Sequence, residues 1–248
     1  MNSEEKINNI IRKSAYVLII ILIIAVIMLL ILKYHVEGEQ NMPFELTDII
    51  AISTAEGYQE ETDDNNNWNV EIYQNNDIYL NIKKNKNYKE EESIKYVTIE
   101  NINYINKPEV GEIYFYRPTS KEENSYIYMD EYEIKEKIVY EGDTKSDIKN
   151  LKISNQGNTI IFRITNKTGQ KYISNEEILT HDGKLLNKVN VNYEQIKAKI
   201  SFDIVITLSS DISYRTNVVL DLPTGDITKQ GISNLNKTDM KDIIFKRE

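Results

Sequence analysis

Residues 198–208 read Ala-Lys-Ile-Ser-Phe-Asp-Ile-Val-Ile-Thr-Leu, and this stretch decides the fold class of the chain. Every even position carries an apolar side chain, whereas the odd positions are polar apart from Val205. Successive side chains of a β-strand point to opposite faces, so the alternation predicts a strand with one buried face. After the polar residues 209–211, apolar side chains return at the even positions of Tyr214, Val218, Leu220 and Leu222, which predicts an antiparallel hairpin.

The same alternation of apolar and polar residues recurs through most of the chain. Asn75, Asn76 and Asp77 separate two alternating runs, residues 70–74 and 78–83, and so predict a hairpin turn. Many strands with short polar turns, and no convincing helix after residue 34, predict an antiparallel, immunoglobulin-like β-sandwich. Further strands are predicted at residues 46–54, 94–105, 112–116, 126–140 and 160–164, which are rich in Tyr, Ile and Val.

A division of this β region is predicted near residue 141. Gly142 and the charged run that follows it interrupt the strand pattern. We therefore expect a membrane-proximal β domain over residues 35–141 and a C-terminal β-sandwich over residues 142–248. One larger sandwich is the alternative.

The N-terminal part contains an uncharged apolar run, residues 15–32. As a helix it would extend about 27 Å, close to the roughly 30 Å hydrocarbon core of a bilayer. A buried core helix would show a polar face, and a cleaved signal peptide would show small residues at a cleavage point; the run has neither. The sequence predicts a transmembrane signal anchor over residues 15–34, after a cytoplasmic tail of residues 1–14.

The distribution of charged residues indicates the orientation of the helix in the membrane and excludes one class of partner. Lys6, Arg12 and Lys13 precede the apolar run, and this bias places the N-terminus in the cytoplasm and residues 35–248 outside. Removing the four bases and two acids of residues 1–33 from totals of 30 and 39 leaves 26 bases and 37 acids, a net charge of −11. Phosphate backbones repel a region with this excess of acidic residues. Nucleic acid is therefore not an expected partner.

Few residues of the sequence suggest a catalytic or metal-binding role. The chain has no cysteine and two histidines, of which His35 follows the apolar run and His181 belongs to a predicted turn with Asp182 and Gly183. A triad around His181 lacks a nucleophile motif, and one histidine cannot build a zinc site. The oxygen-rich segments Asp63 to Asn67 and Asp143 to Asp147 are weak candidates for calcium, because neither fits the EF-hand pattern. We therefore predict no catalytic, cofactor-binding or metal-ligating residues.

The segment Met42-Pro43-Phe44-Glu45-Leu46, followed by Ser53-Thr54-Ala55-Glu56-Gly57 just outside the anchor, resembles uncharacterised single-pass membrane proteins of low-GC Gram-positive, clostridial-type bacteria. This resemblance implies the topology above and no activity.

The function expected from these observations is a non-enzymatic binding or scaffolding module of the cell envelope, held in the lipid bilayer by its helix and directed at an envelope protein. Exposed sheet faces or edge strands would make the contact. Two alternatives remain open: a carboxylate-based surface hydrolase, and a ligand-sensing ectodomain coupled to a membrane partner.

Overall fold

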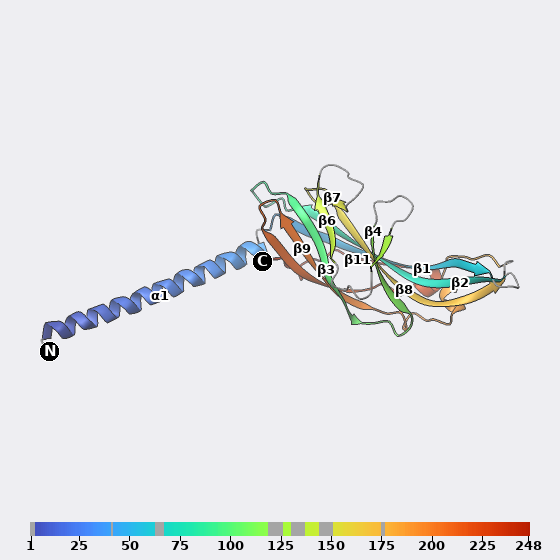
Figure 1. Cartoon of the computed structure of the whole chain (residues 1–248), viewed down its shortest axis with the longest axis horizontal. Helices are drawn as coiled ribbons and strands as arrows, with labels where there is room; N and C mark the ends of the chain where they lie inside the picture. Colours follow the sequence, from blue (N-terminus) through green and yellow to red (C-terminus); the bar gives the residue numbers. More distant parts are fainter. Residues whose placement is uncertain are drawn as a thin grey trace.

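The computed structural model describes residues 3–40, 42–62, 67–118, 126–129, 137–143, 151–174 and 177–248. Helix α1 (Ser3–Gln40) is followed by a mainly β region (Figure 1). The segment Ile7–Leu32 of α1 is long and apolar enough to cross a membrane, and none of it is buried by the rest of the chain. The predicted N-terminal apolar helix is confirmed, and it is longer than residues 15–34.

The β region forms two six-stranded sheets. Sheet A has the strand order β11 (Ile232–Lys237), β1 (Phe44–Thr62), β2 (Asn67–Lys84), β8 (Thr159–Ser174), β4 (Glu112–Pro118) and β5 (Tyr126–Met129). Sheet B has the order β12 (Lys246–Arg247), β10 (Ser213–Asp221), β9 (Lys199–Leu208), β3 (Ile94–Asn106), β6 (Ile138–Gly142) and β7 (Lys152–Ile153). All described pairs are antiparallel except the short β6–β7 pair.

Seven strands follow the order of an immunoglobulin sandwich. When β1, β2, β3, β4, β8, β9 and β10 are lettered A to G in chain order, sheet A contains A-B-E-D and sheet B contains C-F-G. That is the arrangement of the immunoglobulin constant type. The predicted mainly β, immunoglobulin-like fold is confirmed at this level, with the remaining strands added at the sheet edges.

A continuous apolar core lies between the two sheets. Phe162 of β8 and Phe202 of β9 are fully buried and meet edge to face, with ring centroids 5.1 Å apart. The Tyr140 hydroxyl of β6 donates to the backbone carbonyl of Ile161 in β8 and accepts from its amide at 3.1 Å. Because these contacts join strands of opposite sheets, the sheets are the two layers of one sandwich.

The predicted division into residues 35–141 and 142–248 is wrong. Pairs β1–β11, β2–β8, β4–β8 and β3–β9 all join strands from opposite sides of that boundary. Gly142 interrupts the pattern for another reason. A Cβ at this position would lie 1.9 Å from the carbonyl oxygen of Ile94, so the glycine permits a close approach of two strands.

The predicted turn at Asn75, Asn76 and Asp77 is also wrong. These residues lie in the middle of β2, and the hairpin instead joins β1 to β2 through residues 63–66, which are outside the described part of the chain. Asn75 and Asn76 are 3% and 2% exposed and have hydrogen-bond partners on neighbouring strands. Tertiary partners thus satisfy amides that in isolation favour a turn.

Strands β1, β2 and β8 continue past the sandwich, away from α1, and form a distal part of the molecule (Figure 1). The inner face of this part has its own apolar core, which includes Val70, Ile72 and Ile173. Short helices α2 (Lys184–Lys188) and α3 (Ile227–Gln230) contribute Leu185, Leu186 and Ile227 to that core.

Buried polar side chains separate the two cores. Along the inner face of sheet A, Ser53, Gln74, Asn76 and Asn166 are each at most 2% exposed. The Asn76 amide donates to the carbonyl of Ile164 at 3.1 Å, while its oxygen accepts from the Ser53 hydroxyl. Because their polar groups need these partners once buried, these side chains fix the register of β1, β2 and β8 relative to one another.

Candidate functional site

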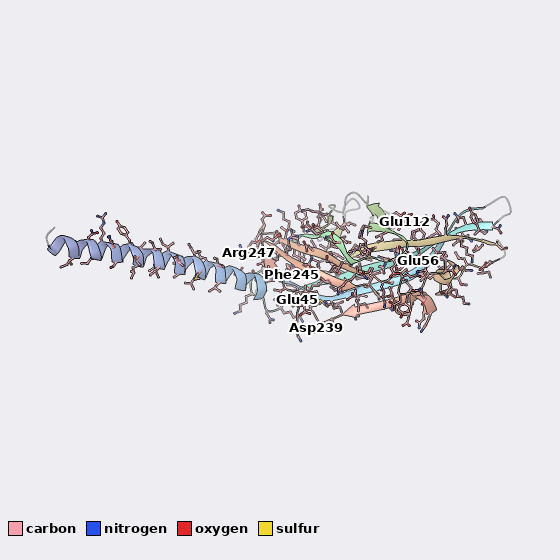
Figure 2. The ribbon with its side chains drawn as sticks, turned by 90° about the horizontal axis from the view of Figure 1, so that it is seen from below. Glu45, Glu56, Glu112, Asp239, Phe245 and Arg247 are labelled. Atoms are coloured by element: carbon pink, nitrogen blue, oxygen red, sulfur yellow. The ribbon has the colours of Figure 1, made fainter. Side chains whose placement is uncertain are left out.

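The outer face of sheet A carries the most distinctive cluster of side chains. On β1 the side chains of Ile49, Ala51 and Ser53 point into the molecule, so Glu56 and Tyr58 lie on the opposite, outward face. Glu56 and Glu112 lie in the part of the β region away from α1 (Figure 2). The face is therefore remote from the apolar helix.

A Glu-x-Tyr pattern occurs on three strands of this face: Glu56-Gly-Tyr58 on β1, Glu71-Ile-Tyr73 on β2 and Glu112-Ile-Tyr114 on β4. In each, the tyrosine hydroxyl donates to the carboxylate of the glutamate two residues earlier, at 2.6 Å in the β4 pair. Side chains two residues apart share one face of a strand, which makes the contact possible. Each bond orients a ring, so less conformational entropy is lost when a ligand binds.

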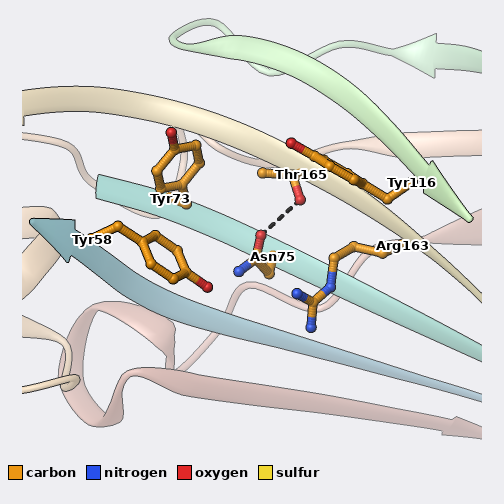
Figure 3. Close-up of a pocket in the computed structure, with 6 residues that line it drawn as sticks. All are labelled: Tyr58, Tyr73, Asn75, Tyr116, Arg163 and Thr165. Atoms are coloured by element: carbon orange, nitrogen blue, oxygen red, sulfur yellow. Dashed lines mark hydrogen bonds between the residues drawn. The ribbon is translucent and has the colours of Figure 1, made fainter. Parts of the chain in front are cut away.

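Tyrosine rings surround a shallow pocket at the centre of the face. Tyr58, Tyr73 and Tyr116 line its sides, and the Tyr58 and Tyr73 rings meet edge to face at 5.5 Å (Figure 3). The Thr165 hydroxyl donates to the Asn75 side-chain oxygen at 2.7 Å between them. The pocket has a volume of about 250 Å³, smaller than the roughly 300–1,000 Å³ of sites that enclose a small molecule.

Arg163 completes the pocket and is paired with Asp77. Its Nε and Nη2 atoms each donate to a carboxylate oxygen of Asp77 at 2.7 Å, a two-point contact with fixed geometry. Their side chains are 19% and 15% exposed. A second ion pair, between Lys167 and Glu71, lies beside Tyr73 on the same face. These pairs stabilise the face and balance charge locally.

Glu56 accepts three hydrogen bonds from described residues, and none of the donors is charged. Thr54 donates to one carboxylate oxygen at 2.8 Å, and both Asn75, at 2.8 Å, and Tyr58 donate to the other. Burial alone would raise the pKa of Glu56, but these hydrogen bonds and the charge of Arg163 outweigh it and lower the pKa. The group is therefore ionised at neutral pH, and burial and the bond to Glu56 raise the pKa of Tyr58 to about 12.

A charged cluster on the outer face of sheet B is organised differently. Arg215 contacts Glu100 at 2.7 Å, Asp203 at 3.0 Å and also Glu248, while Lys137 contacts Glu100 at 3.1 Å. Burial would raise the pKa values of Glu100 and Asp203, but their cationic and amide partners lower them. Each acid here has a cationic partner, so the cluster fastens the C-terminal residue to the sheet.

A second groove, of about 510 Å³, opens between β3 and β4. Tyr104 and Phe115 line it, with ring centroids 6.1 Å apart, and both pack against the main core. Asn103 also lines it and donates to the carbonyl of Asn101 at 2.7 Å. Lys107 also lines the groove, so its wall mixes polar and apolar groups, and none of its described lining residues is acidic.

The residues weighed in the sequence as possible ligands or catalysts do not converge. His181 is exposed in a turn, where Asp182 accepts from the Lys184 amide at 2.8 Å, and His35 lies in α1. Asp143 contacts Lys152 at 3.5 Å, whereas residues 63–66 and 144–147 of the two calcium candidates lie outside the described part. Within the described ranges, no three His, Asp or Glu side chains are placed to share a metal ion.

Sequence reasoning missed the tyrosine face, although one signal was present. The Glu-x-Tyr pattern can be read from the chain, and alternation places both of its side chains on one strand face. The Arg163–Asp77 contact has no such signal, because 86 residues separate its partners. Comparison of the chain with family models, curated proteins and solved structures finds no match, so the interpretation of this site depends on its own chemistry.

Proposed function

We propose that this protein is a membrane-anchored binding module that holds a partner protein of the cell envelope on the outer face of sheet A. The observation that carries the proposal is the set of three Glu-x-Tyr pairs on one face, with Arg163 in the same pocket as Tyr58 and Tyr73. Tyrosine and arginine are enriched where protein interfaces concentrate their binding energy. Rings already held by carboxylates cost little entropy to order on binding.

The anchor and its orientation support a location outside the cytoplasm. Ile7–Leu32 is apolar enough to cross a membrane, and Lys6, Arg12 and Lys13 stand near its N-terminal end. The excess of basic residues favours a cytoplasmic N-terminus. In this orientation the whole β region is extracytoplasmic, and the tyrosine face is directed at the envelope.

Binding is better supported than catalysis. Glycoside hydrolysis needs a carboxylic acid with a raised pKa next to a second carboxylate. Glu56, Glu100, Glu194 and Asp203, the described carboxyl groups with shifted pKa values, are all shifted downward. Ligand sensing is also less well supported than protein binding, because the pocket is shallow.

The proposal is tested by photo-cross-linking of the full chain in native membranes. The photoreactive residue p-benzoylphenylalanine replaces Tyr58, which is 47% exposed, or Val219 on the outward face of sheet B, which is 41% exposed. We expect a discrete protein adduct from position 58 and none from the matched position 219. Equal adducts from both positions, or none from position 58, would contradict the proposed face. Protease treatment of sealed cells should remove a C-terminal tag, and protection of the tag would contradict the orientation.

A further inference from the structure

Glu56 lies on the tyrosine face with only neutral hydrogen-bond donors among its described contacts, and the charge of Arg163 acts on it without an ion-pair contact. A carboxylate offers about four acceptor sites, and the described donors Thr54, Asn75 and Tyr58 occupy three of them. None of these donors is charged, and no Lys, Arg or His of the described residues lies within ion-pair distance of Glu56. A half-buried carboxylate with only neutral partners is unusual, since buried charges are normally paired.

The surroundings of Glu56 suit a cation. One of its oxygens accepts from both Tyr58 and Asn75, which line the pocket, so the carboxylate lies immediately next to the residues that form the pocket wall. The faces of aromatic rings attract cations, and Tyr58, Tyr73 and Tyr116 all line this cavity.

The net charge around the pocket also favours a cationic ligand. Arg163 is balanced by Asp77 through two bonds of 2.7 Å, so the two acids and one base around the pocket leave a net charge of −1. The acidic excess of residues 34–248 adds a long-range field of the same sign. A ligand carboxylate or phosphate would meet repulsion from Glu56, whereas a neutral sugar would leave its charge without a partner.

We infer that the pocket beside Glu56 receives the ammonium group of a lysine side chain supplied by the partner protein. The ammonium would take the remaining acceptor site of the Glu56 carboxylate while the tyrosine rings contact its methylene groups and charge. This inference rests on the proposed function, because it assumes that a protein binds this face. It adds that the contacting segment of the partner is basic.

The test compares two peptides on the full chain in lipid nanodiscs, observed through ¹³C-labelled tyrosine rings by NMR. The probes are acetyl-Gly-Lys-Gly-amide and the same peptide with norleucine in place of lysine, which keeps the methylene chain and removes the charged ammonium group. We expect the lysine peptide to bind about 3- to 30-fold more tightly, the range of a cation–π contact. Glu56→Gln should remove this preference. Glu90→Gln is the matched control because Glu90 also accepts from a tyrosine, Tyr88, at 3.5 Å but lies outside the pocket.

Three results would overturn the inference. The first is equal binding of the two peptides, and the second is an equal loss in Glu56→Gln and Glu90→Gln, which would indicate diffuse attraction to an acidic protein. The third is a response of the tyrosine rings to the neutral sugar chitotetraose, or to choline, in the absence of a response to the lysine peptide. Cross-linking at position 58 is scored separately, so a specific adduct there would leave the proposed function intact while the lysine inference fails.

Discussion

Replacing Asn76 by alanine should lower the free energy of unfolding by about 2–4 kcal/mol. The side chain is 2% exposed, donates to the carbonyl of Ile164 at 3.1 Å and accepts from the fully buried Ser53 hydroxyl. Losing one ordinary hydrogen bond costs about 1 kcal/mol, and leaving a buried hydroxyl without an acceptor costs about 1–3 kcal/mol. The contact with Gln74 is long, 3.4 Å, and adds little.

The measurement is guanidinium unfolding of the full chain in detergent micelles. Far-UV circular dichroism follows the sheets, and fluorescence follows Trp68, the only tryptophan, which packs against the distal core. The control is Asn217→Ala, because Asn217 is exposed on β10 and bonds to Asp203 at 2.8 Å. It should cost less than about 1 kcal/mol. A change below about 0.5 kcal/mol in Asn76→Ala would refute the reasoning, because that is the effect expected of an asparagine in a solvated turn.

Three further outcomes are expected. Phe202→Ala should cost about 3–5 kcal/mol in the same unfolding assay, because it leaves a cavity against Phe162 in the main core. Arg163→Met should destabilise the chain more than Arg163→Met combined with Asp77→Asn, as a double-mutant cycle would measure, since the single change leaves a largely buried carboxylate without its cation. Stability should fall as the pH rises from about 10 to about 12. In the unfolded chain the Tyr58 phenol loses its proton near the ordinary pKa of 10.0, whereas in the folded chain, with a pKa of about 12, it retains the proton. Tyr58→Phe should make this fall shallower in unfolding curves recorded at each pH.

Alternation predicted the strands wherever one face is fully apolar. In β9 and β10 the predicted inward residues are the buried ones, from Ile200 to Leu208 and from Tyr214 to Leu220, and the hairpin between them is observed. The N-terminal helix could also be predicted, because a long uncharged apolar run is typical of a membrane-spanning helix. The spacing of apolar residues along a strand or helix is a local property, so it can be read from a single sequence.

Prediction failed where distant partners decide the conformation. Asn75 pairs with Thr165 and Glu56, and Asn76 pairs with Ser53 and Ile164; these partners from other strands allow polar side chains inside β2. The same dependence explains Gly142, whose role is visible only when Ile94 of another strand lies against it. The tyrosine face needed both kinds of information, since the Glu-x-Tyr pairs are local but their convergence depends on the order of β1, β2, β8 and β4 in sheet A.

The length of β1 has a consequence for where a partner must stand. The strand begins at Phe44, soon after α1, and reaches Tyr58 fourteen residues later. At about 3.3 Å per residue, it raises the tyrosine face roughly 45 Å above the end of the sandwich nearest the helix. If the helix spans a bilayer as proposed, a partner seated flat on the lipid surface would pass beneath the face. The proposed function then implies that the length of β1 selects partners by their distance from the bilayer as well as by their chemistry.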